Sequence, residues 1–214
     1  MNNSAKSAVT IPALPIGNIG AIVNMVRRCG GVPQVTQDPE KLFEAERIIL
    51  SGVGAFEAGM TAIKEGSWEG PLNSAVLKNQ IPVLGICLGM QLMCRASEEG
   101  NSPGLGWVPA EVKKLPSDRE NKIKIPHMGW NEIKIKQESP LFASDNCSKR
   151  FYFVHSYHVV CESASNVLAT TNHGISLTAA IRHKNIYGTQ FHPEKSHRFG
   201  MELIENFLKL HRYA

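Results

Sequence analysis

The stretch Pro82-Val83-Leu84-Gly85-Ile86-Cys87-Leu88-Gly89-Met90-Gln91 decides the fold that we expect for this chain. Its apolar part, from Ile81 to Ile86, predicts a buried strand, and the residues after Cys87 have the apolar spacing of a helix. Glycines two residues before and two residues after Cys87 leave room for a sharp strand-to-helix turn. A thiol on such a turn projects from the end of a sheet, and the helix N-terminus behind it favours the thiolate. The stretch therefore predicts a nucleophile elbow in which sulfur replaces the hydroxyl.

A buried core cysteine is the competing interpretation of Cys87, because free cysteine is among the most buried residue types. The flanking glycines and the strand-turn-helix pattern favour the nucleophile instead. A histidine base with an orienting acid elsewhere in the chain would favour it further.

Strand and helix patterns alternate through the first half of the chain, outward from this turn. The expected elements are helices over residues 19–29, 58–65 and 72–78 and strands over residues 32–36 and 47–50. An apolar run over residues 9–16 is interrupted by Pro12 and Pro15. Such alternation predicts a parallel sheet that helices cover on both faces.

The second half of the chain is dominated by strand patterns separated by turn signals. These strands are expected at residues 107–115, 131–136, 150–154, 167–171, 177–182 and 185–191, before a final helix over residues 199–210. This half should be antiparallel or mixed. We therefore predict an α/β fold with three layers, in which helices flank an open, mostly parallel sheet, as one domain over residues 1–214.

The composition restricts the class of protein and its partners. The 214 residues are 43% hydrophobic and 20% charged, which is typical of a soluble globular chain. The net charge of +4 comes without a block of like charges, so neither nucleic acid nor a membrane is expected as a partner. The five cysteines form no C-x-x-C pair, which favours a reducing compartment over a zinc site or disulfides. Without a signal-peptide pattern or an apolar span, the expected location is the cytoplasm.

The expected base lies in the segment Gln190-Phe191-His192-Pro193-Glu194-Lys195. In extended backbone, residues i and i+2 point to the same side, so His192 and Glu194 can lie together. A carboxylate on one imidazole nitrogen sets the tautomer and leaves the other nitrogen to exchange a proton with a thiol. A strand-end histidine beside an unrelated surface acid is the alternative. The presence of Cys87 on its elbow favours the nucleophilic site.

Acyl chemistry at Cys87 also needs an oxyanion hole. The backbone N–H of Leu88, the residue after the nucleophile, is one natural donor. Gly52-Val53-Gly54 follows the strand over residues 47–50, and its glycines allow a close approach and a peptide flip. A plain tight turn is the alternative, whereas a dinucleotide loop would need a third glycine.

Two histidine-bearing segments allow more than one interpretation. Pro126-His127-Met128-Gly129-Trp130-Asn131 is either a hairpin bend around a core tryptophan or part of a partner surface, and the sequence favours neither. His155 and His158 form an H-x-x-H pair, but no third metal ligand has convincing spacing. Structural histidines are the commoner reading of such a pair, and no metal site is predicted.

With these residues assembled, the chain resembles the class I, triad-type glutamine amidotransferases, and among them the glutaminase subunits of imidazole glycerol phosphate synthase. The resemblance runs from about Asn18 to the C-terminus. It is carried by Gly52-Val53-Gly54-Ala55-Phe56, Gly85-Ile86-Cys87-Leu88-Gly89-Met90-Gln91, Pro126-His127-Met128-Gly129-Trp130-Asn131, Phe153-Val154-His155-Ser156-Tyr157 and Gln190-Phe191-His192-Pro193-Glu194-Lys195-Ser196. The cysteine and histidine segments belong to the whole superfamily, whereas the segment from Pro126 points to this subunit.

The resemblance implies that Cys87 attacks the side-chain amide of glutamine, that His192 protonates the departing ammonia, and that Glu194 orients His192. A γ-glutamyl thioester on Cys87 is then hydrolysed to glutamate, and no cofactor is expected. Glutamine-binding positions of the family match Gly54, Gln91, Glu99 and Ser156. The family's oxyanion strand matches Gly52-Val53, whose peptide must turn to present its N–H.

The resemblance also implies a protein partner, a (β/α)8-barrel cyclase subunit that forms a heterodimer with this chain. Positions that face this partner match Pro126, Met128, Trp130, Tyr152 and Lys195. Ammonia would pass through the barrel to a phosphoribosyl substrate, giving imidazole glycerol phosphate and an aminoimidazole carboxamide ribotide in histidine biosynthesis. Because free ammonia is protonated in water, glutamine hydrolysis should accelerate only when the partner is loaded.

Two stretches depart from the family pattern. Ala13-Leu14-Pro15-Ile16-Gly17-Asn18 stands where the family has D-Y-G-x-G-N, and Ser51 replaces the proline of P-G-V-G. Proline fixes φ and has no N–H, so Ser51 gives the oxyanion strand another donor and more freedom. Two other functions stay open: a paralogous glutaminase that supplies a surface-sugar amidotransferase, and a stand-alone γ-glutamyl cysteine hydrolase. A non-catalytic binding subunit is disfavoured by the presence of Cys87, His192 and Glu194.

Overall fold

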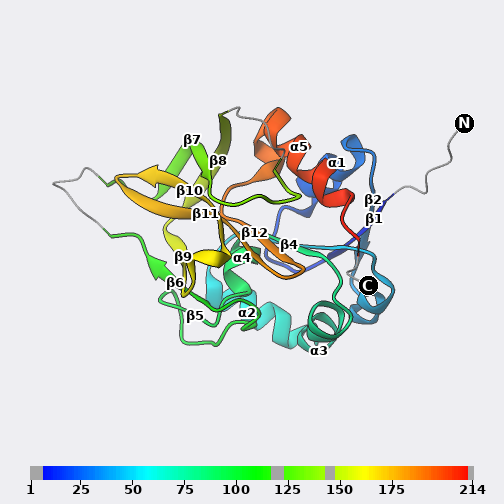
Figure 1. The fold of residues 1–214 in the computed structure, drawn as a ribbon. Helices are drawn as coiled ribbons and strands as arrows, with labels where there is room; N and C mark the ends of the chain where they lie inside the picture. Colours follow the sequence, from blue (N-terminus) through cyan, green and yellow to red (C-terminus); the bar gives the residue numbers. More distant parts are fainter. Residues whose placement is uncertain (1–6, 117–122, 143–147, 212–214) are drawn as a thin grey trace, which may run out of the picture.

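A nine-stranded sheet runs through the centre of the structure, a computed structural model that describes residues 7–116, 123–142 and 148–211 (Figure 1). The strand order is β2-β1-β3-β4-β12-β11-β10-β7-β8. Neighbouring strands are parallel in the first half of this order and antiparallel in the second. The predicted α/β class, with a sheet that changes from parallel to antiparallel, is confirmed.

The parallel half contains the strands that end at the expected site. Its members are β1 (Ala8–Pro12), β2 (Val32–Thr36), β3 (Ile48–Gly52), β4 (Val83–Cys87) and β12 (Ile186–Thr189). In this half β4 lies between β3 and β12, and all three run in the same direction. Their carboxyl ends therefore meet at one edge of the sheet, which is where parallel α/β sheets bind ligands.

The antiparallel half carries the remaining long strands. Its members are β11 (Ile175–His183), β10 (Val167–His173), β7 (His127–Ile135) and β8 (Lys149–His155). A small second sheet packs beside it, built from β5 (Ala96–Ser97), β6 (Ala110–Lys114) and β9 (Tyr157–Cys161). The chain passes from the large sheet to the small one at Ser156, between β8 and β9.

Helices cover both faces of the large sheet (Figure 1). One face packs against α1 (Ile19–Arg28) and α5 (His197–Leu208), and the other against α2 (Phe56–Glu65), α3 (Glu69–Asn73) and α4 (Leu88–Leu92). The side chains of β3 alternate between the two cores: Ile49 lies in the first, whereas Ile48 and Leu50 lie in the second. The remaining helical turns are η1 (Pro39–Glu44), η2 (Ser74–Lys78), η3 (Ala164–Asn166) and η4 (Pro193–Lys195).

Several elements differ from the sequence-based expectation. The interrupted run over residues 9–16 forms β1, an inner strand, because Pro12 is its last residue and the missing N–H falls at the strand end. The helix expected over residues 72–78 is the end of α3 followed by the single π-helical turn η2.

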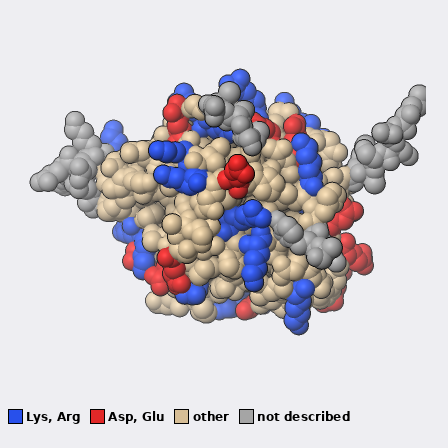
Figure 2. Space-filling view, in the orientation of Figure 1, with Lys and Arg blue, Asp and Glu red and all other residues tan. Residues whose placement is uncertain are grey.

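Within the described residues, none of the helices is long and apolar enough to cross a membrane. Charged side chains of both signs are scattered over the face in Figure 2.

Candidate active site

Cys87 lies at the sharp turn between β4 and α4. Its backbone has φ 54° and ψ −108°, a conformation that L residues rarely adopt and that costs of order 1–3 kcal/mol. The two glycines make the turn possible. A Cβ atom on Gly89 would overlap the carbonyl oxygen of Leu50, and one on Gly85 would lie 2.7 Å from the backbone nitrogen of Met90. The predicted strand, turn and helix are all present.

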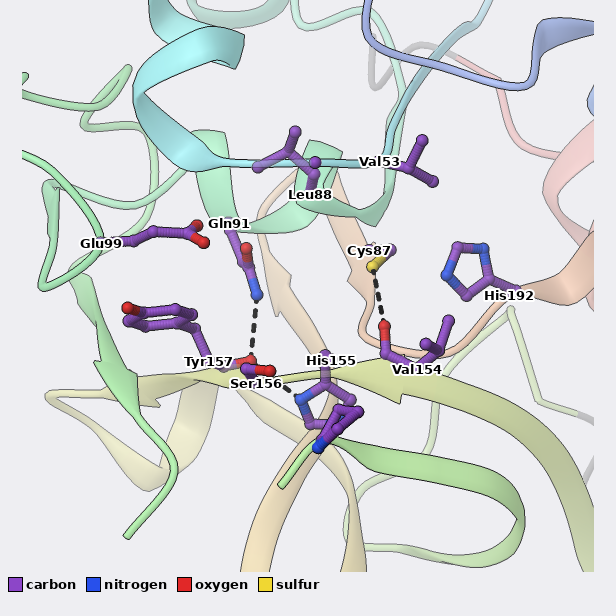
Figure 3. Close-up of a pocket in the computed structure, with 12 residues that line it drawn as sticks. Val53, Cys87, Leu88, Gln91, Glu99, Val154, His155, Ser156, Tyr157 and His192 are labelled. Atoms are coloured by element: carbon purple, nitrogen blue, oxygen red, sulfur yellow. Dashed lines mark hydrogen bonds between the residues drawn. The ribbon is translucent and has the colours of Figure 1, made fainter. Parts of the chain in front are cut away.

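His192 reaches the same edge of the sheet from β12, the strand beside β4. Its Nδ1 lies 2.7 Å from Oε1 of Glu194, whose side chain is only 5% exposed. Backbone contacts hold the histidine in place: its N–H donates to the carbonyl of Tyr152 at 2.9 Å, and its own carbonyl accepts from Oγ of Ser196 at 2.6 Å. Its Nε2 is buried and makes no well-formed hydrogen bond with the described residues. In Figure 3 the ring lies beside the sulfur of Cys87.

The environment of His192 keeps its imidazole protonated at neutral pH. Burial alone would lower the pKa of His192, but the interactions with Cys87 and Glu194 outweigh it and raise the pKa to about 9. A protonated imidazole beside the sulfur can supply the proton that a departing amine needs. The sulfur also lies 3.8 Å from Nε2 of Gln190 and 4.0 Å from the carbonyl oxygen of Val154.

The two backbone N–H groups expected to form the oxyanion hole, those of Leu88 and Val53, differ in their hydrogen bonding. Leu88 is the first residue of α4, where backbone N–H groups lack an intrahelical acceptor. The N–H of Val53 instead donates to the carbonyl oxygen of Ile16, with a distance of 2.5 Å. Val53 lines the cavity beside Cys87 and Ile16 does not, so this N–H points away from the place where an oxyanion would form. In this conformation the Val53 N–H is therefore not available as an oxyanion donor.

A cavity of about 330 Å³ opens beside Cys87, a size suited to an amino acid. Its lining includes all four residues that the resemblance assigned to glutamine: Gly54, Gln91, Glu99 and Ser156. The amide of Gln91 donates to the carbonyl of Tyr157 at 3.1 Å (Figure 3). It also donates to Oε1 of Gln190 at 3.3 Å. A carboxylate oxygen of Glu99 accepts from the backbone N–H of Phe56 at 2.9 Å.

Four of the five residues expected to face a partner form one surface beside His192, which we call the partner face. It consists of Met128 and Trp130 on β7, Tyr152 on β8, and Lys195. Met128 is 60% exposed and Trp130 41% exposed, so the tryptophan is a surface residue and not part of the core. The rings of Trp130 and Tyr152 lie 6.3 Å apart, and the ammonium of Lys195 lies 5.6 Å from the Tyr152 ring. The fifth residue, Pro126, lines the cavity instead.

The sequence did not single out several residues of this region. His197 stacks on Trp130 with ring centroids 5.4 Å apart. Its backbone has a positive φ of 46°, which no sequence motif indicated. Gln190, within the histidine motif, is fully buried against Gln91 and Cys87. His155 and His158 lie on strands of different sheets, and the described residues contain no cluster of three or more metal-binding side chains.

The comparisons with known proteins agree with this geometry. The family model for glutamine amidotransferase class-I matches residues 17–210. Imidazole glycerol phosphate synthase subunit HisH 2 of Methanococcus maripaludis is 49% identical over 196 residues, covering 91% of this chain and 95% of its own length. The subunit of the same name from Pseudomonas aeruginosa is 42% identical, with 91% and 96% covered. This chain belongs to the class I glutamine amidotransferases, in the family of these HisH subunits.

Solved structures show the same amidotransferase fold at much lower identity. PurLQS from Thermotoga maritima has a TM-score of 0.73 at 18% identity and covers 95% of this amidotransferase and 98% of its own chain. Another structure, a glutamine amidotransferase from the same organism, has a TM-score of 0.62 at 20% identity and covers 87% of this chain and 75% of its own. The relatives compared above are named as synthase subunits, so the comparisons do not favour the surface-sugar paralogue or the stand-alone hydrolase.

Proposed function

We propose that this amidotransferase, as one domain, hydrolyses the side-chain amide of glutamine to glutamate and ammonia. Sγ of Cys87 attacks the amide carbon, and the electrons of the C=O bond move to oxygen. The C–N bond then breaks, a thioester remains on Cys87, and His192 gives its proton to the departing amine. Water attacks the thioester, His192 takes a proton from it, and glutamate leaves. The observation that carries this proposal is the buried Nε2 of His192, which has no hydrogen-bond partner among the described residues and lies beside the sulfur at a cavity lined by Gln91 and Glu99.

The hydrogen bond between Val53 and Ile16 suggests how hydrolysis is restrained. An oxyanion hole with two donors typically contributes a factor of about 10²–10³ for each donor. In the structure the Val53 N–H is engaged by Ile16, so this hole would have one donor until that bond breaks. We infer that rotation of the Gly52-Val53 peptide is the step that a loaded partner permits.

The proposed partner is a (β/α)8-barrel cyclase subunit that receives the ammonia in the cytoplasm. Together the two subunits would form imidazole glycerol phosphate and aminoimidazole carboxamide ribotide for histidine biosynthesis. Support comes from the names of the relatives, which are subunits of imidazole glycerol phosphate synthase, and from the exposed aromatic partner face beside His192.

The chemistry can be tested on the purified chain with a diazoketone analogue of glutamine. We expect covalent labelling at Cys87, located by peptide mass spectrometry, and protection from labelling by excess glutamine. The Cys87→Ser variant should stay unlabelled. Iodoacetamide, which needs only an accessible thiol, serves as the control reagent. If iodoacetamide modified Cys87 while the analogue did not, the proposed glutamine site would be wrong.

The pathway is tested separately, in a histidine-requiring strain that lacks its own glutaminase subunit. Co-expression of this amidotransferase with the cyclase subunit of the same organism should restore growth without histidine. Failure of growth despite soluble expression of both subunits would contradict the pathway but leave the labelling chemistry intact.

A further inference from the structure

A chain of buried and partly buried hydrogen bonds connects β7 to the cavity. Successive residues of β7 point to opposite faces, so Met128 and Trp130 are exposed on one side, while on the other side His127 is buried and Asn131 partly buried. The side-chain amide of Asn131 lies 3.1 Å from Nε2 of His127, and Nδ1 of His127 lies 2.9 Å from Nε2 of His155. Nδ1 of His155 in turn lies 2.8 Å from the carbonyl oxygen of Tyr157. We call His127 and His155 the histidine pair.

The partners at each end determine which nitrogen of each ring carries the proton. Asn131 uses its oxygen to accept from the N–H of Glu132, so its amide nitrogen is the atom that faces His127 and donates. Nε2 of His127 is therefore an acceptor, and its Nδ1–H donates to His155. At the other end Tyr157 offers a carbonyl, which can only accept, so Nδ1 of His155 carries a proton. Both rings are neutral, and the donors all point from β7 toward the cavity.

The chain continues beyond Tyr157 to the nucleophile. The carbonyl oxygen that accepts from His155 also accepts from the amide of Gln91. Gln91 donates to Gln190, whose own amide nitrogen lies 3.8 Å from the sulfur of Cys87. Figure 3 shows His155 beneath Ser156 and Tyr157, with Gln91 reaching down to the same backbone. Interior β7 and the nucleophile are thus joined by side chains and one backbone carbonyl.

The histidine pair is buried, so water cannot replace a hydrogen bond that either ring loses. His127 is 3% exposed and His155 6% exposed. The ring of His127 lies between Phe153, at 4.6 Å, and His173, at 4.2 Å. A buried donor or acceptor left without a partner costs about 1–3 kcal/mol, so a break in this chain should move its neighbours.

We propose that His127 and His155 are positioning residues for glutamine, which hold the Ser156-Tyr157 backbone and Gln91 in the substrate-binding conformation and couple that conformation to β7. This inference rests on the proposed glutaminase function. It gives the interior of β7 a role in substrate binding, while the other side of the same strand carries two residues of the partner face. Movement of β7 would then change the affinity for glutamine as well as the rate of attack.

The test separates binding of the glutamine analogue from reaction with it. Saturation kinetics of Cys87 labelling by the diazoketone yield an inhibition constant and a limiting rate. His127→Phe keeps a flat ring between Phe153 and His173 but removes both hydrogen bonds. We expect this variant to raise the inhibition constant about tenfold, the usual effect of one lost buried hydrogen bond, with a smaller change in limiting rate. His127→Asn keeps a donor near the position of Nδ1 and should recover most of the affinity.

A second pair of variants covers the case in which the first does not fold. His155→Leu removes the donor to Tyr157, and His155→Asn retains one there, so the same loss and recovery are expected. His158→Phe is the matched control, because His158 lies on β9 outside the cavity lining. An inhibition constant within twofold of the wild type in His127→Phe, or equal impairment in the Asn and the apolar variants, would overturn the inference. Absence of labelling in the wild type would instead overturn the proposed function.

Discussion

Gly89 shows how the absence of one side chain determines the position of Cys87. Two residues after Cys87, it lets α4 begin directly against β3, where a Cβ would overlap the Leu50 carbonyl oxygen. The nearest atoms are the carbonyl oxygen and carbon of Leu50. Because both belong to the backbone, they cannot rotate away as a side chain could. We expect Gly89→Ala to lower the free energy of unfolding by about 2–3 kcal/mol, as overpacking does, and to reduce labelling of Cys87 by the glutamine analogue.

The control for this substitution is Gly20→Ala in α1. Gly20 is exposed, and a Cβ there would meet only a side-chain oxygen of Asn18 at 3.8 Å. Alanine should stabilise this helix by about 0.5–1 kcal/mol. Urea unfolding of both variants measures the difference. Equal stability changes would contradict the steric account of Gly89.

Glu194 has a role that depends on its charge and not on its size. Its carboxylate lies 2.7 Å from Nδ1 of His192 and contributes to the raised pKa of that imidazole. Glu194→Gln keeps the shape but can present an N–H to Nδ1. We expect glutaminase turnover with the cyclase subunit to fall by about 10²–10⁴, with little change in melting temperature. Glu65→Gln, on the exposed end of α2, should leave turnover unchanged.

The residue scale also shows what a sequence can and cannot predict. His192 and Glu194 were predictable because their spacing in extended backbone and the proline between them act locally. The engagement of Val53 by Ile16 was not, because the acceptor is a backbone carbonyl of a segment that is 37 residues away and departs from the family pattern. His155 was visible in an H-x-x-H pair and in the resemblance segment from Phe153 to Tyr157, and neither predicted its contact with His127. Its partner His127 lies on another strand, so their contact depended on the pairing of β7 with β8.

At the scale of elements, β7 and β8 determine how close the partner face lies to His192. Trp130 pairs with Tyr152 in the strand register, and Tyr152 bridges to His192. Truncation of an exposed aromatic anchor typically costs about 2 kcal/mol or more of binding energy. We therefore expect Trp130→Ala to weaken binding to the proposed cyclase subunit by about 30-fold in titration calorimetry.

Phe43 provides a matched control for that prediction. It is an aromatic residue with the same 41% exposure as Trp130, but it lies in η1 outside the partner face. Phe43→Ala should bind the cyclase subunit as the wild type does. If both alanine variants bound equally well, the partner would contact a different face.

The order of elements was partly predictable for a physical reason. Apolar runs such as β4 and periodic helices such as α1 carry their own signal. The β9 strand was missed because the chain continues from β8 after one residue, Ser156, and only its pairing with β6 makes it a separate strand. That break between two sheets is where Ser156 and Tyr157 enter the cavity.

At the scale of the whole molecule, the combined contribution of His127, His155 and His192 to the free energy of unfolding should be largest near pH 6.5. Burial lowers the pKa of His127 to about 4 and of His155 to about 3, from an ordinary value of 6.5. Below pH 6.5 the unfolded chain therefore binds more protons than the folded one, and stability falls as the pH falls. Although burial opposes it, Cys87 and Glu194 raise the pKa of His192 to about 9, so between pH 6.5 and 9 the folded chain binds more protons and stability falls as the pH rises.

Single variants can separate the two sides of this curve. We expect His155→Asn to remove roughly 1–2 kcal/mol of the loss between pH 6.5 and about pH 5, because one of the buried neutral rings is gone. His192→Gln should flatten only the alkaline side, by roughly 1–3 kcal/mol. Urea unfolding at about pH 5, pH 6.5 and pH 9 measures both effects. Titratable groups that all the variants share cancel when the free energy of unfolding of each variant is compared with that of the wild type. A His192 variant that changed the acid side instead would show that this imidazole is neutral in the folded chain, and the proton that we assign to the departing ammonia would then need another source.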